Sequence, residues 1–204
     1  NFVKMLRECV LSVDNSEWST WGSCHTMGLY YGGLRRVSAG KRSPLAFGGA
    51  VHVGLDTFFN DYKRPGVEVV QLGRKSIGAA LADAAITELD NMNDPKRNSD
   101  KLQDILSSYF LEYDLTPGLQ FKIVEQNGKR MVEQSFSVPL GEVSVLTKNF
   151  GLVKVAVVWI GKIDIIAHYL NALMIVDHKT TTVMGERFTD DKERSSQMLG
   201  YTYA

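Results

Sequence analysis

Hydrophobic and polar positions divide the chain near residue 118. Before that point apolar residues recur at spacings of three and four, which is the pattern of one face of a helix. After it, from Leu119 to Ile123, the period becomes two, as in a half-buried strand. We therefore predict that helices come first and an antiparallel meander second. The predicted helices cover residues 20–30, 45–62, 76–89 and 99–113, and a last one begins near residue 189.

Turn signals separate the predicted strands. Asn127-Gly128 is a strong hairpin signal, so residues 131–138 should return beside residues 119–123. The chain should break again near residues 149–151. The further predicted strands cover residues 143–146, 153–166 and 172–179.

The predicted strand at residues 172–179 ends in charged side chains. Because side chains alternate along a strand, Asp177 and Lys179 should point the same way and His178 the opposite way. Asp-x-Lys occurs four times in the chain, but only here does it end an apolar, buried type of strand. A carboxylate beside an ammonium suits a hard cation and a polarised water.

Asp164 supplies a second carboxylate on the preceding predicted strand. The chain is expected to reverse near residues 169–171, so Asp164 and Asp177 can converge on one cation. Taken separately, Asp164 could simply end a strand, and Asp177 with Lys179 could form a surface ion pair of little energy. Their joint occurrence at this spacing argues against both alternatives.

The predicted helix at residues 45–62 carries a candidate ligand. Ser43-Pro44 is a good helix start, with serine as the cap and proline in the first turn. His52 lies one turn beyond Gly48 and Gly49, where small residues would let another backbone or a ligand come close. By itself, a histidine on an apolar helix is more often a hydrogen-bonded core residue than a ligand.

Composition narrows the class of protein. The chain has 204 residues, enough for one domain with a full core. Its 23 basic and 23 acidic side chains balance, so the net charge does not support strong nonspecific attraction to nucleic acid. A local basic groove remains open, although solvated surface is the simpler interpretation of both candidate sets. These are Arg35, Arg36, Lys41 and Arg42, and Lys148, Lys154 and Lys162.

The cysteines and the two chain ends indicate where in the cell the protein is located and how much of it the sequence covers. Cys9 and Cys24 cannot form a disulfide framework, so a reducing, cytoplasmic location is the default. No apolar stretch is long enough to cross a bilayer, so we expect no membrane partner. The chain begins without Met and ends inside a predicted helix, so we expect a fragment of a longer protein. We predict one domain over residues 1–204, with a helical insertion at 65–118.

Several segments together resemble a known family, the PD-(D/E)XK nuclease superfamily, and within it the RecB-like exonuclease branch, which includes phage-encoded and CRISPR-adaptation nucleases. We recognise no such resemblance in residues 65–118. The resemblance implies a restriction-endonuclease-like α/β fold with a central mixed β-sheet flanked by helices. The matching segments are Leu45 to His52, Gly161 to Asp164, Ile175 to Thr180 and Gln197 to Tyr201, with Trp21 to Cys24 before them.

The resemblance also implies a metal site. Asp164, Asp177 and the main-chain carbonyl of His178 would bind Mg²⁺ or Mn²⁺, with His52 as a further ligand. An iron–sulfur cluster, which one branch of the family binds through four cysteines, is not supported by the two present. Glu133 lies where relatives often carry a glutamate, but we interpret it as structural.

Further roles follow from the same resemblance. Lys179 would activate the attacking water or stabilise charge on the phosphate. Gln197 and Tyr201, four residues apart on the last helix, would share a face and orient Lys179 or the phosphate. We assign no chemistry to the side chains of His168 and His178.

The function expected from these residues is divalent-metal-dependent hydrolysis of single- or double-stranded DNA. We expect an exonuclease acting in recombination, repair or phage DNA processing, with a helicase or recombinase as a protein partner. The main alternative is a catalytically silent module that binds nucleic acid or docks on such a partner. The presence of both the acid and the lysine argues against it. A hydrolase of small phosphoesters is a third alternative, which the resemblance disfavours.

Overall fold

The computed structural model describes residues 10–14, 43–83, 86, 90, 94–148, 151–181, 197 and 201. The chain divides into two compact units. The helix-bearing unit comprises residues 40–134 and 163–182, and the long-strand unit comprises residues 1–39, 135–162 and 183–204. The predicted helix at residues 20–30 and the start of the predicted helix near 189 lie outside the described residues.

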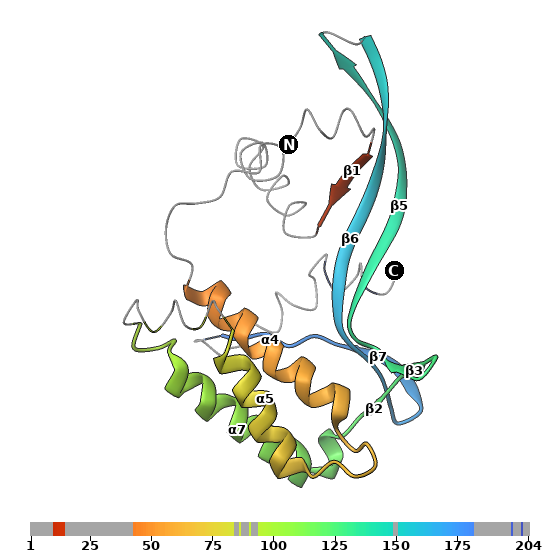
Figure 1. Ribbon diagram of the computed structural model, residues 1–204. Coiled ribbons are helices and arrows are strands. Elements are labelled where there is room, and N and C mark those ends of the chain that lie inside the picture. Colours follow the sequence, from red (N-terminus) through yellow and green to blue (C-terminus); the bar gives the residue numbers. More distant parts are fainter. Residues whose placement is uncertain are drawn as a thin grey trace. The chain divides into compact units, whose positions relative to one another are not determined.

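Three helices of the helix-bearing unit, within the described residues, pack against one another (Figure 1). The first begins at Ser43, as the Ser43-Pro44 signal predicts. The third begins after Asn98, whose side chain accepts a hydrogen bond from the Lys101 N–H at 2.9 Å. None of the described helices is long and apolar enough to span a membrane. The helices are α4 (Ser43–Asp61), α5 (Val69–Leu81) and α7 (Ser99–Leu115).

The start of α5 corrects the prediction of a helix from residue 76. The chain turns at Arg64, whose carbonyl accepts a hydrogen bond from the Val67 N–H at 3.2 Å. Glu68 then takes the N-cap position with extended backbone angles. The helix therefore begins as soon as the Pro65-Gly66 turn is complete, because no residue between Val69 and Ser76 prevents helical geometry.

Five of the described strands form a mixed sheet centred on β6 (Gly151–Tyr169), and the other two form a separate two-stranded sheet. In the helix-bearing unit, β6 pairs antiparallel with β2 (Lys122–Ile123) and β7 (Ala172–Val176). In the long-strand unit, its residues 156–159 pair in parallel with β1 (Val10–Val13). The long strand β5 (Val132–Thr147) also pairs with β6. This confirms the predicted α/β class with a central mixed sheet.

The predicted pairing of consecutive strands holds for β5, β6 and β7, whereas β2 pairs with β6 and not, as predicted, with residues 131–138. The hairpin at Asn127-Gly128 joins β3 (Glu125–Gln126) to β4 (Lys129–Arg130), and both turn residues have positive φ. Leu119 belongs to a short 3₁₀ helix, η2 (Pro117–Leu119), so β2 begins later than predicted.

Two predicted strands, residues 131–138 and 143–146, merge into the single strand β5. Pro139 does not end it, because proline is tolerated in a strand wherever its missing N–H is not needed by a partner. Gly141 adopts φ 125°, a conformation that glycine takes readily. At the other end of the meander, β7 stops at Val176, so Asp177, His178 and Lys179 follow the strand and do not complete it.

Aromatic rings hold α4 against α7. Phe58 stacks on Phe110 with ring centroids 4.1 Å apart, and Phe59 meets the edge of Tyr113 at 5.2 Å. Burying each such ring contributes about 1.5 to 3 kcal/mol. Ile165 of β6 belongs to the same core, so the rings also fix α4 beside the strand that carries Asp164.

Gly54 lets the three helices approach closely. A Cβ atom at this position would lie 2.7 Å from Cδ1 of Leu106 on α7 and 3.3 Å from Cβ of Ala80 on α5. Leu106 and Ala80 are both fully buried, so neither can move into solvent to make room. The absence of a side chain on α4 is therefore what sets the distance between the helices.

We expect Gly54→Ala to lower the free energy of unfolding by about 1 to 2 kcal/mol, because overpacking outweighs the better helix propensity of alanine. Gly49→Ala in the same helix is the matched control, since a Cβ atom there would meet nothing within 4 Å. The control should raise stability by about 0.5 to 1 kcal/mol. Urea denaturation of both variants measures this. Equal stabilisation by both would show that the close approach at Gly54 is not a constraint.

Candidate metal centre

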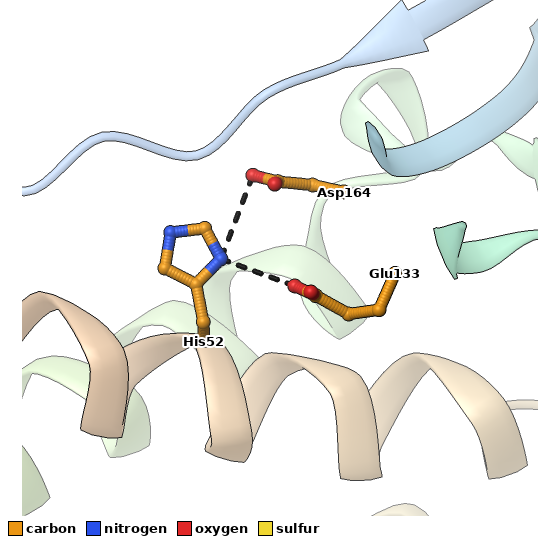
Figure 2. Close-up of side chains that lie close together, drawn as sticks. All are labelled: His52, Glu133 and Asp164. Atoms are coloured by element: carbon orange, nitrogen blue, oxygen red, sulfur yellow. Dashed lines mark hydrogen bonds and ion pairs between the residues drawn. The ribbon is translucent and has the colours of Figure 1, made fainter. Parts of the chain in front are cut away.

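His52 of α4 faces two carboxylates from the sheet. Its Nδ1 atom lies 3.2 Å from Oε1 of Glu133 and 3.6 Å from Oδ2 of Asp164. Figure 2 shows the imidazole rising from the helix, with Glu133 and Asp164 converging on it. The ligand atoms of these three residues all lie within 4.8 Å of one another. The three segments are far apart in the sequence, so packing of α4 on the sheet creates the group.

Asp164 is a carboxylate held in an apolar setting. It lies on β6 between the buried residues Ile163 and Ile165, and only 8% of its surface is exposed. The main-chain N–H of His178 donates a hydrogen bond to its Oδ2 atom at 2.7 Å. Ile165 pairs with Val176, so one further step in the same register sets Asp164 opposite Asp177. The predicted reversal is confirmed at Leu170-Asn171, where both residues have positive φ.

Glu133 joins this group although sequence reasoning gave it a structural role. It follows the buried Val132 in β5 and has φ 51°, in the left-handed region that costs a residue with a side chain about 1 kcal/mol or more. The conformation directs the carboxylate of Glu133 to His52. Neither the backbone angle nor the approach of α4 could be found from the pattern of the strand.

Asp177 and Lys179 form the predicted pair next to this group. The Lys179 ammonium donates a hydrogen bond to Oδ1 of Asp177 at 2.8 Å. The Asp177 side chain is fully buried, which contradicts a solvent-exposed surface ion pair. Thr180 then passes over α4, where a Cβ atom on Gly48 would lie 3.4 Å from its Oγ1 atom. The small residue at Gly48 therefore admits another segment of chain, as predicted.

His178 is anchored between helices, and its Nδ1 atom lies 3.9 Å from Oδ2 of Asp164. Its Nε2 atom is hydrogen-bonded to the Tyr109 hydroxyl of α7 at 2.8 Å, and its ring stacks on Phe59 of α4 with centroids 5.8 Å apart. Burial lowers the pKa of His178 to about 4, so the ring is neutral near pH 7. The ring thus fixes the main chain whose N–H binds Asp164. The predicted metal-binding role of the His178 carbonyl stays a prediction.

The electrostatics of the group favour a bound cation. Burial raises the pKa of Asp164, and the charges of Asp177 and Glu133 raise it further, against the opposing effects of the His178 N–H and His52. The hydrogen bond that His52 donates to Glu133 raises the pKa of His52, against burial, and Asp164 also raises it. Clustered carboxylates repel one another unless a proton or a cation lies among them.

The donor set also fits a small divalent ion by size. Neighbouring ligands of a six-coordinate ion at about 2.1 Å are about 3 Å apart, and opposite ligands are about 4.2 Å apart. The separations of 3.2 and 3.6 Å in this group, all within 4.8 Å, lie close to that range. Carboxylate oxygens suit Mg²⁺ and Mn²⁺, and an imidazole nitrogen is a common further ligand for transition metals.

Comparison with known proteins identifies the family. A family model of the PD-(D/E)XK nuclease superfamily matches residues 28–204. The chain belongs to the PD-(D/E)XK nuclease superfamily. Neither the curated proteins nor the solved structures contain a match to the chain. The matched range includes His52, Glu133, Asp164 and the segment from Asp177 to Lys179, so the whole group belongs to the nuclease part of the chain.

Other predicted residues of this PD-(D/E)XK protein lie in the long-strand unit. The Tyr201 hydroxyl donates a hydrogen bond to the Lys162 carbonyl at 2.9 Å, and Gln197 Nε2 donates to the Tyr201 oxygen. Their predicted role in orienting Lys179 or a phosphate stays a prediction. Of the two candidate basic sets, Lys154 pairs with Glu142 at 3.8 Å. Arg35, Arg36, Lys41, Arg42, Cys9, Cys24 and Trp21 lie outside the described residues.

We expect Mn²⁺ to bind at His52, Glu133 and Asp164. Replacing either carboxylate by its amide, in Asp164→Asn or Glu133→Gln, removes a charged ligand and should weaken Mn²⁺ binding at least about tenfold. Isothermal titration with the metal measures the affinity, and circular dichroism confirms the fold. Asp104→Asn on α7 is the matched control, since that side chain is 69% exposed and lies outside the group. Unchanged affinity in both site variants would refute the assignment.

We expect Tyr109→Phe to act on the site through His178. Loss of the half-buried hydroxyl should lower the free energy of unfolding by about 0.5 to 1.5 kcal/mol and weaken Mn²⁺ binding up to about tenfold. Tyr169→Phe is the control, because the Tyr169 hydroxyl bonds to the Gly118 carbonyl at an exposed position. Denaturation and metal titration are measured on both variants. Loss of stability with unaltered metal affinity would mean that Tyr109 does not position the site.

Proposed function

We propose that this chain is a divalent-metal-dependent deoxyribonuclease that hydrolyses phosphodiester bonds. One observation carries the proposal: in a chain of the PD-(D/E)XK nuclease superfamily, a histidine and two carboxylates converge within reach of one ion. A buried acid paired with a lysine follows the strand beside them. The sequence motifs predict His52, Asp164, Asp177 and Lys179 as site residues, whereas Glu133 is added by the fold.

His52, Glu133 and Asp164 would hold the metal, and the neighbouring Asp177 would add negative charge to the site. When bound, Mg²⁺ or Mn²⁺ supplies a polarised water and neutralises phosphate oxygens. The side chains that hold it are preorganised by the fold. The His178 N–H fixes one oxygen of Asp164, and the left-handed backbone of Glu133 directs its carboxylate inward.

Lys179 is the group that we assign to the phosphate or the attacking water. Its hydrogen bond with the buried Asp177 holds the ammonium in one position, while 31% of the lysine side chain remains exposed. An ammonium in this setting can donate to a phosphate oxygen as negative charge develops there. Asp177 thus acts on Lys179 as well as on the metal site.

The finer assignment rests on the matching segments of the sequence. We propose an exonuclease of the RecB-like branch, active in recombination, repair or phage DNA processing, with a helicase or recombinase as its partner. Gly161 to Asp164 and Ile175 to Thr180 support this branch. The two cysteines support a cytoplasmic location.

Lys179→Ala should lower the turnover of DNA by about 10² to 10³ while Mn²⁺ affinity changes only a few-fold, because the lysine donates to the substrate and not to the metal. Asp177→Ala should remove cleavage altogether. Labelled linear and circular DNA, single- and double-stranded, is incubated with Mg²⁺ or Mn²⁺, and product length from an end label separates exonuclease from endonuclease.

The matched control is Lys101→Ala, on the exposed face of α7 and ion-paired with Asp104 at 3.4 Å. It should cleave as the unaltered protein does. DNA that remains intact with the unaltered protein, or equal cleavage by the Asp177→Ala variant, contradicts the proposed activity. Binding of DNA without cleavage by the unaltered protein would favour the catalytically silent module.

A further inference from the structure

A cavity of about 650 Å³ lies in the helix-bearing unit, at the end of α4 away from Ser43. We call it the basic groove. It is lined by Lys63 just after α4, by Lys122 of β2, by His168 of β6, and by Phe121, Glu125 and Arg130. A groove of this size is typical of ligand sites. Its lining carries more basic than acidic side chains, whereas the chain as a whole has no net charge.

The single carboxylate among these six residues is already neutralised. Glu125 accepts a hydrogen bond from Nε of Arg130 at 3.2 Å. Nη1 of the same guanidinium donates to the carbonyl groups of Phe59 and Tyr62, at 2.8 and 2.5 Å. Arg130 therefore satisfies the carbonyl end of α4 and the only acid, and its charge is used within the protein.

The two lysines of the groove differ from Arg130, whose charge is neutralised within the protein. Lys63 donates a hydrogen bond to the neutral side chain of Gln120, and neither Lys63 nor Lys122 has an ion pair with a carboxylate in the described part of the chain. By contrast, Lys75 and Lys101 on the helices have ion pairs with Asp61 and Asp104. The positive charge of the groove is thus available to a ligand.

The sheet places two of these groups side by side. Lys122 and His168 are directly opposite each other in the antiparallel pairing of β2 with β6. Side chains in such pairs have Cβ atoms about 4.5 to 5.5 Å apart. A phosphate between them would accept hydrogen bonds from the Lys122 ammonium and from a ring N–H of His168. Phe121 also lines the groove, and its ring packs against Phe59 and Tyr113 of the core.

The distance from the metal centre follows from regular geometry. Ten residues of α4 and its end separate His52 from Tyr62 of the groove, which is about 15 Å along a helix. Four residues of β6 separate Asp164 from His168, which is about 14 Å along a strand. The two routes agree, so the groove lies a few nucleotides from the candidate ligands.

We propose that the basic groove is a second phosphate-binding subsite, which holds the backbone of the nucleic acid a few nucleotides from the bond that is cut. The proposal rests on the proposed nuclease function. It assigns Lys63, Lys122 and His168 to substrate binding and leaves the chemistry to the metal centre. The ligand chemistry is that of a phosphodiester within a strand, since one phosphate cannot fill a groove of this size.

The first experiment measures binding without cleavage. The full chain with Lys63→Gln and Lys122→Gln is compared with the unaltered protein by fluorescence anisotropy of a labelled 20-nucleotide duplex and single strand, in EDTA, over a range of salt. The pair should weaken binding about tenfold at low salt, and the slope of log affinity against log salt should fall by about 1 to 2. Lys96→Gln with Lys101→Gln removes the same charge outside the groove and is the control.

Two results overturn the proposal. One is unchanged affinity in the groove variant, and the other is an equal loss in the control, which would show that net charge alone matters. A catalytic readout separates the groove from the proposed activity: a subsite should raise KM with little change in kcat. Groove-dependent binding without cleavage by the unaltered protein refutes the nuclease activity but supports the groove, whereas cleavage without groove-dependent binding refutes only the groove.

A second experiment locates the contact. Oligonucleotides that carry one neutral methylphosphonate at successive positions are bound to both proteins. The unaltered protein should lose affinity at one or two positions at a constant distance from the cleavage site, and the groove variant should be insensitive there. Competition with inorganic phosphate tests the other source of the same chemistry. Loss of oligonucleotide binding at low millimolar phosphate, with no positional effect, would show that the groove binds a free anion and would overturn the proposal.

Discussion

A buried carboxylate is the constraint on which the helix-bearing unit depends. Asp164 is 8% exposed on a strand whose neighbouring residues belong to the core. Burying a charge without partners is costly. The structure offsets this cost with the His178 N–H and with His52, while Glu133 and Asp177 add charge of the same sign. Such an arrangement stores repulsion that a bound cation would relieve, which is how the fold would support the proposed metal-dependent activity.

Helix α7 has a part in this arrangement. It lies in a stretch where the sequence motifs showed no resemblance, although the family model spans it, and its Tyr109 is hydrogen-bonded to His178. His178 is also held by the ring of Phe59, which packs against Tyr113 of the same helix. Contacts from α4 and α7 therefore meet on one imidazole. The main chain of that residue binds Asp164 and connects Asp177 to Lys179, so α7 supports the site through His178.

The protein has no excess of either charge, but charges of one sign are concentrated at particular sites. Acidic and basic residues are equal in number, so long-range steering of a polyanion is weak. Negative charge is gathered at the metal centre, whereas the basic groove collects lysines that no described carboxylate neutralises. A polyanionic strand would be held by short-range contacts in the groove and by the cation at the centre. Affinity would then depend on a few positions of the strand.

Local pattern was enough to predict much of the fold. Ser43-Pro44 placed the start of α4, Asn127-Gly128 placed a hairpin, and the apolar run before Asp177 placed β7 opposite the strand that carries Asp164. His52, Asp164, Asp177 and Lys179 were found because their chemistry, their spacing and the family resemblance pointed to the same site. These are properties of short segments, which a periodicity of two or about four residues can report.

Tertiary structure alone decided the rest. Glu133 entered the metal centre through a left-handed backbone conformation, and Tyr109 reached His178 through the packing of α7 on α4. The merging of two predicted strands in β5 depended on which N–H groups the neighbouring strand requires. Lys63, Lys122 and His168 are distant in the sequence and meet only where β2 and β6 pair beside the end of α4. Sequence by itself determined which residues have the necessary chemistry, and packing determined which of them meet, because distances between remote segments depend on side chains that no local pattern records.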